Sequence, residues 1–328
     1  MLEVAILAIT ISLALAYAYA NGMNDAANAV ATAISTRALT PAAAVLMAGV
    51  LNAAGALSGT AVAKTIGKGI IDPELMTQYA VASAIAASVI WVIIATRLGF
   101  PVSVSHSLIA GVVGAGTAVA GFSELNTAVV VKVLLALALS PLLGFIGGFL
   151  LMIAIYWALR RRAPSSVNAV GSKLQILSAA FLSYSHGRND GQNAMGIIAL
   201  SWAVYSSQDL SIDFWMIIVS ALAIGLGTAI GGWRVIRTLG MRVTRLEPIS
   251  GFAANFTAAS VIEAASSIGL PVSTTHTSTS TILGVGATRR FSAVRWGVTR
   301  SILLAWLVTY PFCLVLGWVL AKTLTAIT

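Results

Sequence analysis

The sequence predicts an all-α, polytopic membrane protein: two inverted repeats of about five membrane segments each, with broken helices and hairpin-like half-helices at the midplane. Of 328 residues, 58% are hydrophobic and 9% are charged, whereas soluble domains carry roughly 25% charged residues. Apolar runs of about 20 residues recur between short polar links, which is typical of membrane helices rather than of a barrel. Long sequence motifs also occur twice, in the same order.

The apolar runs predict five crossings in each half. The first repeat covers 1–159, a cytoplasmic link covers 160–173, and the second repeat covers 174–328. The first apolar stretch, residues 1–20, contains an acidic residue, Glu3, and continues into further apolar sequence, so we expect a retained first span rather than a cleaved signal peptide. The predicted crossings lie near 2–34, 41–60, 75–96, 101–121 and 128–159, then near 174–204, 212–232, 247–267, 271–288 and 301–325.

The basic residues indicate the orientation of the chain. A net charge of +9 would favour nucleic acid as a partner of a soluble protein, but here it reports topology, and no nucleic-acid partner is expected. Six acidic residues fall in the remaining links, which places both termini outside the plasma membrane: Glu3, Asp72, Glu74, Glu124, Asp209 and Asp213. No complete Walker A motif occurs, so we do not expect ATP to drive the protein. The basic links are 160–173, 234–245 and 289–300.

Two motif pairs define the internal repeat. NGMNDAANA, which begins at Asn21, matches HGRNDGQNA, which begins at His186. GFPVSVSHSLIAGVVGAG, which begins at Gly99, matches GLPVSTTHTSTSTILGVG, which begins at Gly269. Because five crossings is an odd number, the second copy enters the membrane with opposite polarity. Inverted repeats are typical of secondary transporters, whose substrate and ion sites lie near the midplane on interrupted helices.

The Asn-Asp motifs predict a cation site. Each lies inside an apolar segment, where a buried carboxylate is costly. Asn21–Gly22 sits where a helix break would expose backbone carbonyls, and carbonyl, amide and carboxylate oxygens suit a small hard cation such as Na⁺. The alternative is that these residues only cap a helix that ends at the break. The predicted cation ligands are Asn24, Asp25, Asn28, Asn189, Asp190 and Asn193.

The Pro-Val-Ser motifs predict an anion site. Hydroxyl groups follow Pro101 and Pro271 at the expected start of a half-helix. Such a start presents free backbone N–H groups and the positive end of the helix dipole, so an oxyanion can bind without an arginine. The alternative is that the hydroxyls bond to the preceding helical turn or join neighbouring helices. The hydroxyl donors are Ser103, Ser105, Ser273, Thr274 and Thr275.

Four further intramembrane residues are candidates for coupling or gating. A histidine there carries protons or serves as a packing donor, and His186 gives a weaker indication than the other two. An arginine within the second motif has three readings: pairing with Asp25 or Asp190, contact with the anion, or extension to the interface. The glutamate has no acidic counterpart, because Ile93 stands at the matching place. The four candidates are His106, His276, Arg188 and Glu263.

The motifs resemble the repeated signature of the inorganic phosphate transporter family, the sodium- or proton-coupled phosphate permeases. The resemblance spans nearly the whole chain. It implies a symporter that alternates access between the two membrane faces, needs no cofactor and forms a homodimer. The coupling ion is Na⁺ or H⁺ by the resemblance, and the two oxygen-rich sites favour Na⁺. The motifs are NGMNDAANAVAT, SHGRNDGQNAMGIIAL, GFPVSVSHSLIAGVVGAG and GLPVSTTHTSTSTILGVGA.

The same resemblance implies which residues hold phosphate, and it leaves the anion open. The Gln192-Asn193 pair resembles a compact prokaryotic branch that also contains a sulfate permease, so sulfate is the alternative substrate. An anion channel is a second alternative. An intramembrane aspartyl protease is a third, although the YD and GxGD sequences it needs are missing. The implied phosphate-binding residues are Ser103, Ser105, Ser273, Thr274, Thr275, Asp25, Asp190 and Gln192.

Overall fold

A computed structural model describes residues 2–68 and 70–327 of the protein, and these residues are helical with short connections. The first half contains α1 (Leu2–Ser35), α2 (Pro41–Ala56), α3 (Ala61–Lys68), α4 (Gln78–Leu98), α5 (Val104–Val119) and α6 (Thr127–Leu159). The second half contains α7 (Pro164–Ser206), α8 (Phe214–Ile230), α9 (Trp233–Arg237), η3 (Thr238–Arg242), α10 (Pro248–Ser267), α11 (Thr274–Ala287) and α12 (Trp296–Ile327).

Most helices follow the predicted segments, but α3, α9 and η3 lie between predicted crossings, and the link between the halves differs as well. Residues 164–173, expected in that link, form the first turns of α7. Within the described ranges, α1, α4, α6 and α12 are each long and apolar enough to cross a membrane. α2 and α3 are bent by 73° at a short break, and α8 is bent by 56° from the helical segment after it. The protein is therefore an all-helical, multi-span membrane protein with broken helices.

The segments expected to cross at 101–121 and 271–288 are short helices instead. α5 has 16 residues and α11 has 14, or about 24 and 21 Å, whereas the hydrocarbon core is about 30 Å thick. A tight turn joins each to the helix before it, through Gly99 (φ 79°) and Gly269 (φ 70°). Glycine adopts this left-handed conformation readily at helix C-termini. α4–α5 and α10–α11 are therefore helical hairpins.

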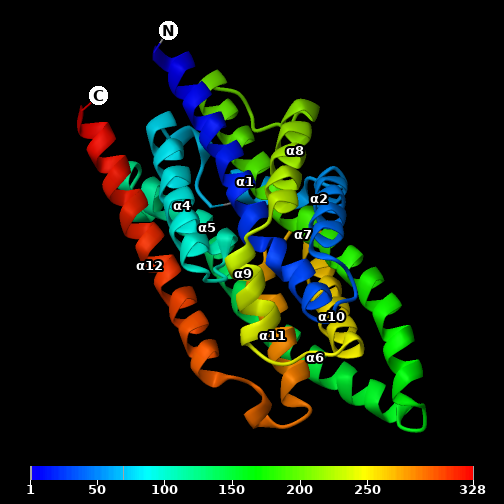
Figure 1. Cartoon of the computed structure of the whole chain (residues 1–328). Helices are drawn as coiled ribbons and strands as arrows, with labels where there is room; N and C mark the ends of the chain where they lie inside the picture. Colours follow the sequence, from blue (N-terminus) through cyan, green and yellow to red (C-terminus); the bar gives the residue numbers. More distant parts are fainter. Residues whose placement is uncertain (1, 69, 328) are drawn as a thin grey trace.

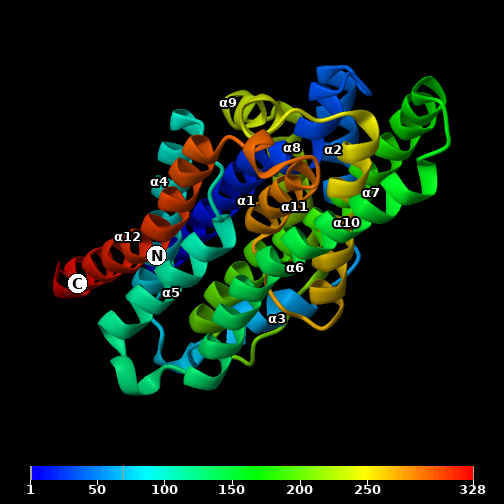
Figure 2. The ribbon, with the colours of Figure 1, turned by 90° about the horizontal axis from the view of Figure 1, so that it is seen from below.

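Both termini lie at one end of the molecule, and the connection between α6 and α7 lies at the other end (Figure 1). This agrees with the prediction that the termini share a side, while the identity of that side stays a prediction. In the view from below, α11 lies in the middle of the bundle (Figure 2). It packs there against α1, α6 and α10. The second hairpin thus reaches the long helix that carries the first Asn-Asp motif.

The break expected at Asn21–Gly22 is absent, because α1 is one continuous helix. Gly22 serves close packing instead: a Cβ atom there would collide with the carbonyl oxygen of Ile224 in α8. Gly187, the matching residue of α7, meets the carbonyl oxygen of Asn52 in α2 in the same way. Small residues allow helix backbones to approach closely in membranes. The long helix of each half is therefore packed against the second helix of the other half.

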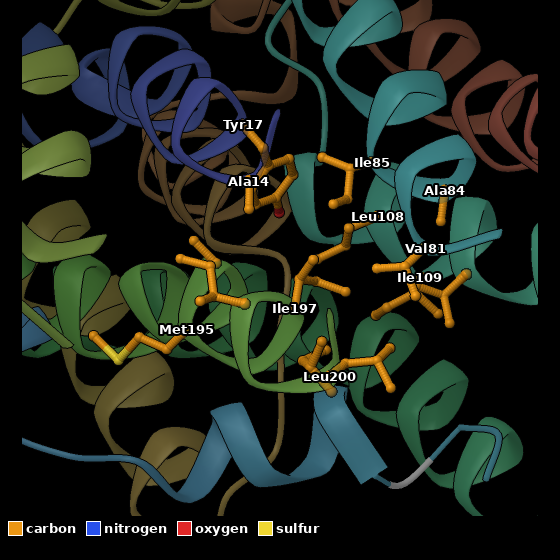
Figure 3. Close-up of a cluster of buried hydrophobic side chains, with 14 of the residues drawn as sticks. Ala14, Tyr17, Val81, Ala84, Ile85, Leu108, Ile109, Met195, Ile197 and Leu200 are labelled. Atoms are coloured by element: carbon orange, nitrogen blue, oxygen red, sulfur yellow. The ribbon is translucent and has the colours of Figure 1, made fainter. Parts of the chain in front are cut away.

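An apolar core packs between the long helices α1 and α7 and the first hairpin. Figure 3 shows Tyr17, Ile85, Leu108 and Ile197, from α1, α4, α5 and α7, gathered in one cluster. All four side chains are almost completely buried. The Tyr17 hydroxyl lies at the edge of this cluster and donates a hydrogen bond to the carbonyl oxygen of Val104 at the tip of the first hairpin (3.3 Å). The core thereby holds the hairpin tip against α1.

Candidate functional site

The carboxylates of the two Asn-Asp motifs converge at the crossing of α1 and α7. Asp25 and Asp190 are each only 1% exposed. The Thr274 hydroxyl, at the start of α11, lies 3.0 Å from Asp25 Oδ2 and 3.3 Å from Asp190 Oδ2. Thr275 donates to the other oxygen of Asp25 (2.8 Å). The second hairpin therefore meets both carboxylates directly.

The last asparagine of each motif reaches the hairpin of the opposite half. Asn28 Nδ2 donates to the hydroxyl oxygen of Thr275 (3.0 Å), and Asn193 Nδ2 donates to that of Ser105 (3.0 Å). The two asparagines occupy the same place in their motifs, and so do the two hydroxyl residues. The two contacts are thus the same contact made twice, each time between halves.

The first asparagine of each motif holds a hairpin of its own half. Asn24 Nδ2 donates to the Thr96 hydroxyl (2.7 Å) and the Phe100 carbonyl (3.4 Å). Asn189 makes the corresponding bonds to the Ser266 hydroxyl (2.8 Å) and the Leu270 carbonyl (3.2 Å). Both side chains are fully buried. Their amide groups position the hairpin turns, and their role as cation ligands stays a prediction.

His186 lies between the two carboxylates. Its Nε2 is 3.4 Å from Asp25 Oδ2 and 3.5 Å from Asp190 Oδ2, and its Nδ1 bonds to the side-chain oxygen of Asn52. Asn21, the matching residue of α1, instead donates from Nδ2 to Asp190 Oδ2 (3.2 Å). One ring nitrogen of the histidine and one oxygen of each carboxylate, atoms that could ligate a metal ion, all lie within 4.8 Å of one another.

The hairpin tips present helix N-termini to the same place. Ser103 and Ser273 cap α5 and α11, because their hydroxyl oxygens accept the N–H groups of His106 (3.2 Å) and His276 (3.1 Å). The residues of each first turn carry backbone N–H groups without a partner inside the helix. An oxyanion next to these turns would meet hydrogen-bond donors and the positive end of two helix dipoles.

Several buried acceptor atoms around the carboxylates lack a donor among the described residues. Buried polar atoms are normally hydrogen-bonded, so a group of unpaired acceptors indicates a bound cation or a ligand that donates hydrogen bonds. Carboxylate and amide oxygens of this kind fit a hard cation. These atoms are Asn21 Oδ1, Asn28 Oδ1, Asn193 Oδ1 and Asp190 Oδ1.

The model of the phosphate transporter family matches residues 21–317, which is most of the chain and includes both Asn-Asp motifs and both hairpins. The chain belongs to the phosphate transporter family. This family consists of transporters, so the intramembrane aspartyl protease is rejected as an alternative.

Relatives of known description agree with the assignment. The transporter is 42% identical to a "probable low-affinity inorganic phosphate transporter" of Rhizobium meliloti (strain 1021), over 92% of this chain and 91% of the relative. It is also 42% identical to a protein of Bacillus subtilis (strain 168) with the same description, over 90% of each. A solved structure, "the sodium-dependent phosphate transporter", superposes with a TM-score of 0.91 at 28% identity, over 99% of this chain and 100% of that one.

Three other predicted residues of the transporter make contacts with groups other than the two carboxylates. Gln192 Oε1 accepts the N–H groups of Val62 (2.8 Å) and Ala63 (3.2 Å) at the start of α3, and its role in phosphate binding stays a prediction. Arg188 pairs with Glu263 of α10 rather than with Asp25 or Asp190. This ion pair therefore links α7 to α10 of the second hairpin. The Arg188 side chain also lies near Gly59, in the break between α2 and α3.

The remaining two histidines meet where the hairpins approach each other. The rings of His106 and His276 have centroids 4.7 Å apart, and His276 also stacks on Trp306 of α12 at 3.7 Å. The Trp306 indole donates to the carbonyl oxygen of Pro101 at the first tip (2.9 Å). A packing role accounts for these contacts, and the coupling role of both histidines stays a prediction.

Sequence reasoning did not single out Asn52 or Tyr17 as parts of this site, and it named Asn21 only as the place of a helix break. Asn52 is the fully buried polar residue of α2, and Tyr17 lies on the face of α1 that continues toward the motif. The repeat itself offered one signal. His186 and Asn21 are the first residues of the two matched motifs, so two polar side chains occupy corresponding places beside the carboxylates. That match indicates a role for His186 at the site more strongly than the residue type alone does.

Proposed function

We propose that the protein imports inorganic phosphate by symport with Na⁺. The observation that carries this proposal is the convergence of Asp25, Asp190 and the two hairpin tips on one buried place. Two adjacent carboxylates repel each other and repel phosphate in a medium of low dielectric constant. Cations must therefore bind before or together with the anion, which makes transport of one dependent on the other.

The phosphate contacts follow from the helix N-termini at the tips. Ser103, Ser105 and Ser273 lie in or next to the first turns of α5 and α11, beside unpaired backbone N–H groups. Thr274 and Thr275 now donate to the carboxylates. When cations neutralise Asp25 and Asp190, these two hydroxyls become free to turn toward the anion.

Na⁺ is favoured over H⁺ for two reasons. The unpaired acceptors near the carboxylates include amide oxygens of Asn28 and Asn193, which bind a metal cation but do not take up protons. The similar solved structure is described as sodium-dependent. A proton at Asp25 or Asp190 is the alternative, and imposed gradients separate the two.

Phosphate is favoured over sulfate by a carboxylate that accepts a hydrogen bond. HPO₄²⁻ donates one hydrogen bond and sulfate donates none, so an ionised carboxylate at the site discriminates between the two anions. Asp190 Oδ1, which lacks a donor among the described residues, is such an acceptor. An anion channel, the other alternative, would conduct without saturation and without coupling to a cation.

The two halves are proposed to be inverted repeats. If each hairpin enters and leaves the membrane by one face, each half has three full crossings, an odd number like the predicted five, so the second half is again inverted. The paired contacts of Asn28 and Asn193 support this arrangement. Alternating access then follows from rocking of one set of helices against the other around the shared site. The outside location of the termini and the homodimer stay predictions, for protease accessibility and light scattering to check.

An uptake assay tests the proposal. Purified protein in liposomes is given phosphate, arsenate or sulfate under an imposed Na⁺ or H⁺ gradient. We expect saturable phosphate uptake that an inward Na⁺ gradient accelerates, competition by arsenate but little by sulfate, and loss of uptake in Asp190→Asn. Asp213→Asn, a control on an exposed aspartate before α8, should behave as wild type. Phosphate uptake that neither gradient accelerates would refute symport.

A further inference from the structure

A large basic pocket lies away from the carboxylate cluster, at the end of the molecule that holds the connection between α6 and α7. Its volume is about 740 Å³, and its lining includes Ser35 and Thr36 at the end of α1 and Asn168 near the start of α7. Four arginines from three separate links of the chain also line it. They precede or follow α1, α10, α11 and α12: Arg37, Arg245, Arg289 and Arg295.

The charges of this pocket are only partly neutralised. Glu247 is the acidic residue of the lining, and it pairs with Arg289 (2.6 Å). Arg295 donates to the carbonyl oxygen of Met241 (3.4 Å), and none of the described acidic residues pairs with it. The guanidinium groups of Arg37 and Arg245 have no partner in the part of the chain that the structure describes. The pocket therefore keeps an excess of positive charge.

Arg37 is held in a backbone conformation that opposes its residue type. Its φ is +63°, in the left-handed region, where a residue with a Cβ is strained and where helices usually end in glycine. The neighbouring Thr36 hydroxyl donates to Gln175 Oε1 of α7 (2.7 Å) and fixes this turn. Strained backbone persists where the surrounding structure over-determines it, often at binding sites. Here it directs an arginine to the pocket.

The repeat provides an internal comparison. A pocket of about 540 Å³ near the other end of α7 contains Glu74 and Met76. These match Thr244 and Leu246 of the basic pocket in the alignment that pairs the two hairpin motifs. That second pocket is lined by acidic residues and by no arginine. The fold therefore tolerates either charge at this place. A general excess of basic residues on the cytoplasmic side explains arginines in the links but not their convergence on one pocket.

We propose that the basic pocket binds a phosphate-type oxyanion, supplied either as free inorganic phosphate or as the headgroup of an anionic phospholipid. Guanidinium groups bind such oxyanions by paired, charge-assisted hydrogen bonds. Basic pockets between membrane helices also hold lipid headgroups on the cytoplasmic side. The site is separate from the transport site, because Asp25 and Ser35 are ten residues apart on α1, or about 15 Å.

An occupant of this pocket would join elements that transport must move. Arg245 lies before the base of α10 and Arg289 lies after the end of α11, so both ends of the second hairpin border the pocket. Arg37 belongs to the end of α1. A bound oxyanion therefore bridges the base of the hairpin to α1 and stabilises one arrangement of the two.

The test uses the full chain in a zwitterionic detergent and in vesicles. The pocket variant is Arg37→Gln with Arg245→Gln. The matched control, Arg242→Gln with Arg290→Gln, removes two exposed arginines from the same end that do not line the pocket. Equilibrium dialysis with labelled inorganic phosphate in Na⁺-free buffer counts anions bound per chain. Thermal unfolding in vesicles of phosphatidylcholine, with and without phosphatidylglycerol, measures the response to an anionic headgroup.

Either of two results supports the site and identifies its ligand. If free phosphate is the ligand, the pocket variant binds phosphate at least tenfold more weakly than wild type and control. If a headgroup is the ligand, phosphate binding is unchanged, but the stabilisation by phosphatidylglycerol is lost in the pocket variant alone. If the pocket variant matches the control in both measurements, the proposal is wrong. Arg245→Gln alone, which leaves the strained turn intact, serves as a second variant if the double variant does not fold.

Discussion

At the residue scale, the site combines contacts that occur twice with contacts that occur once. The amide-to-hydroxyl bonds of Asn28 and Asn193 are matched in the two halves. The neighbours of the carboxylates are not matched, because His186 stands where the first half has Asn21. Thr274, which touches both carboxylates, stands where the first half has Val104. The carboxylates therefore share one asymmetric environment.

The matched contacts predict matched effects. We expect Asn28→Ala and Asn193→Ala each to raise the phosphate concentration for half-maximal uptake by about three- to tenfold, since a hydrogen bond contributes roughly 0.5–1.5 kcal/mol and 1.4 kcal/mol is tenfold. Asn126→Ala, at the exposed start of α6, is the control. A normal phosphate dependence in both site variants would contradict the arrangement.

The contact between His186 and Asn52, which the first half lacks, predicts that the effect of changing Asn52 depends on His186. The Asn52 side chain of α2 bonds to His186. In the other half, the residue of α8 that meets Gly22 as Asn52 meets Gly187 is Ile224, which has no polar side chain. We expect Asn52→Leu to raise the Na⁺ concentration for half-maximal uptake about fivefold in wild type, because residues in contact couple by roughly 0.5–3 kcal/mol. In a His186→Asn background the same change should add nothing. Equal effects in both backgrounds would mean that Asn52 does not act through His186.

At the element scale, the sequence predicted helix positions well because the signals are local. The hairpin turns follow from Gly99 and Gly269 and from the serine caps after them. The absent break at Asn21–Gly22 could not be predicted locally, because the role of Gly22 depends on α8, which lies in the other half of the chain. The candidate site residues were found because their motifs occur twice in the sequence. Asn52 belongs to neither motif and was missed.

Close packing at these glycines predicts a loss of stability on small additions. A Cβ atom at Gly187 would collide with the backbone of α2, and overpacking typically costs about 1–3 kcal/mol. We expect Gly187→Ala to lower the unfolding temperature of the detergent-solubilised protein by several degrees. Gly297→Ala is the control, since nothing lies within 4 Å of that position. If Gly187→Ala is as stable as the control, the two helices do not approach so closely.

At the scale of the whole molecule, the duplicated architecture carries unequal charge. The pocket at one end is basic and its counterpart at the other end is acidic. Beside the site, Arg188 and Glu263 form an ion pair where the first half has Met23 and Ile93. The two halves therefore have the same arrangement of helices but different charges. The two ends of the molecule consequently differ in electrostatic potential.

The ion pair predicts a rescue. Glu263→Ile leaves the Arg188 guanidinium without its partner in a membrane segment, which is costly, so we expect slower uptake and less folded protein. The double variant Arg188→Met with Glu263→Ile reproduces the first half at this place and should recover folded yield, measured by size-exclusion chromatography. Recovery of uptake as well would show that the pair only holds the hairpin. A double variant worse than Glu263→Ile alone would contradict the pairing.

The crossing of α1 and α7 means that neither half can assemble the proposed transport site by itself. Asn28 needs a hydroxyl from the second half, and Asn193 needs one from the first. A chain severed between Arg160 and Ala163, where no helix is interrupted, should yield two inactive fragments that regain transport when co-expressed. If the halves are inverted repeats, as proposed, a single ancestral copy would have functioned only as an antiparallel pair, and duplication would have joined that pair into one chain whose halves then diverged.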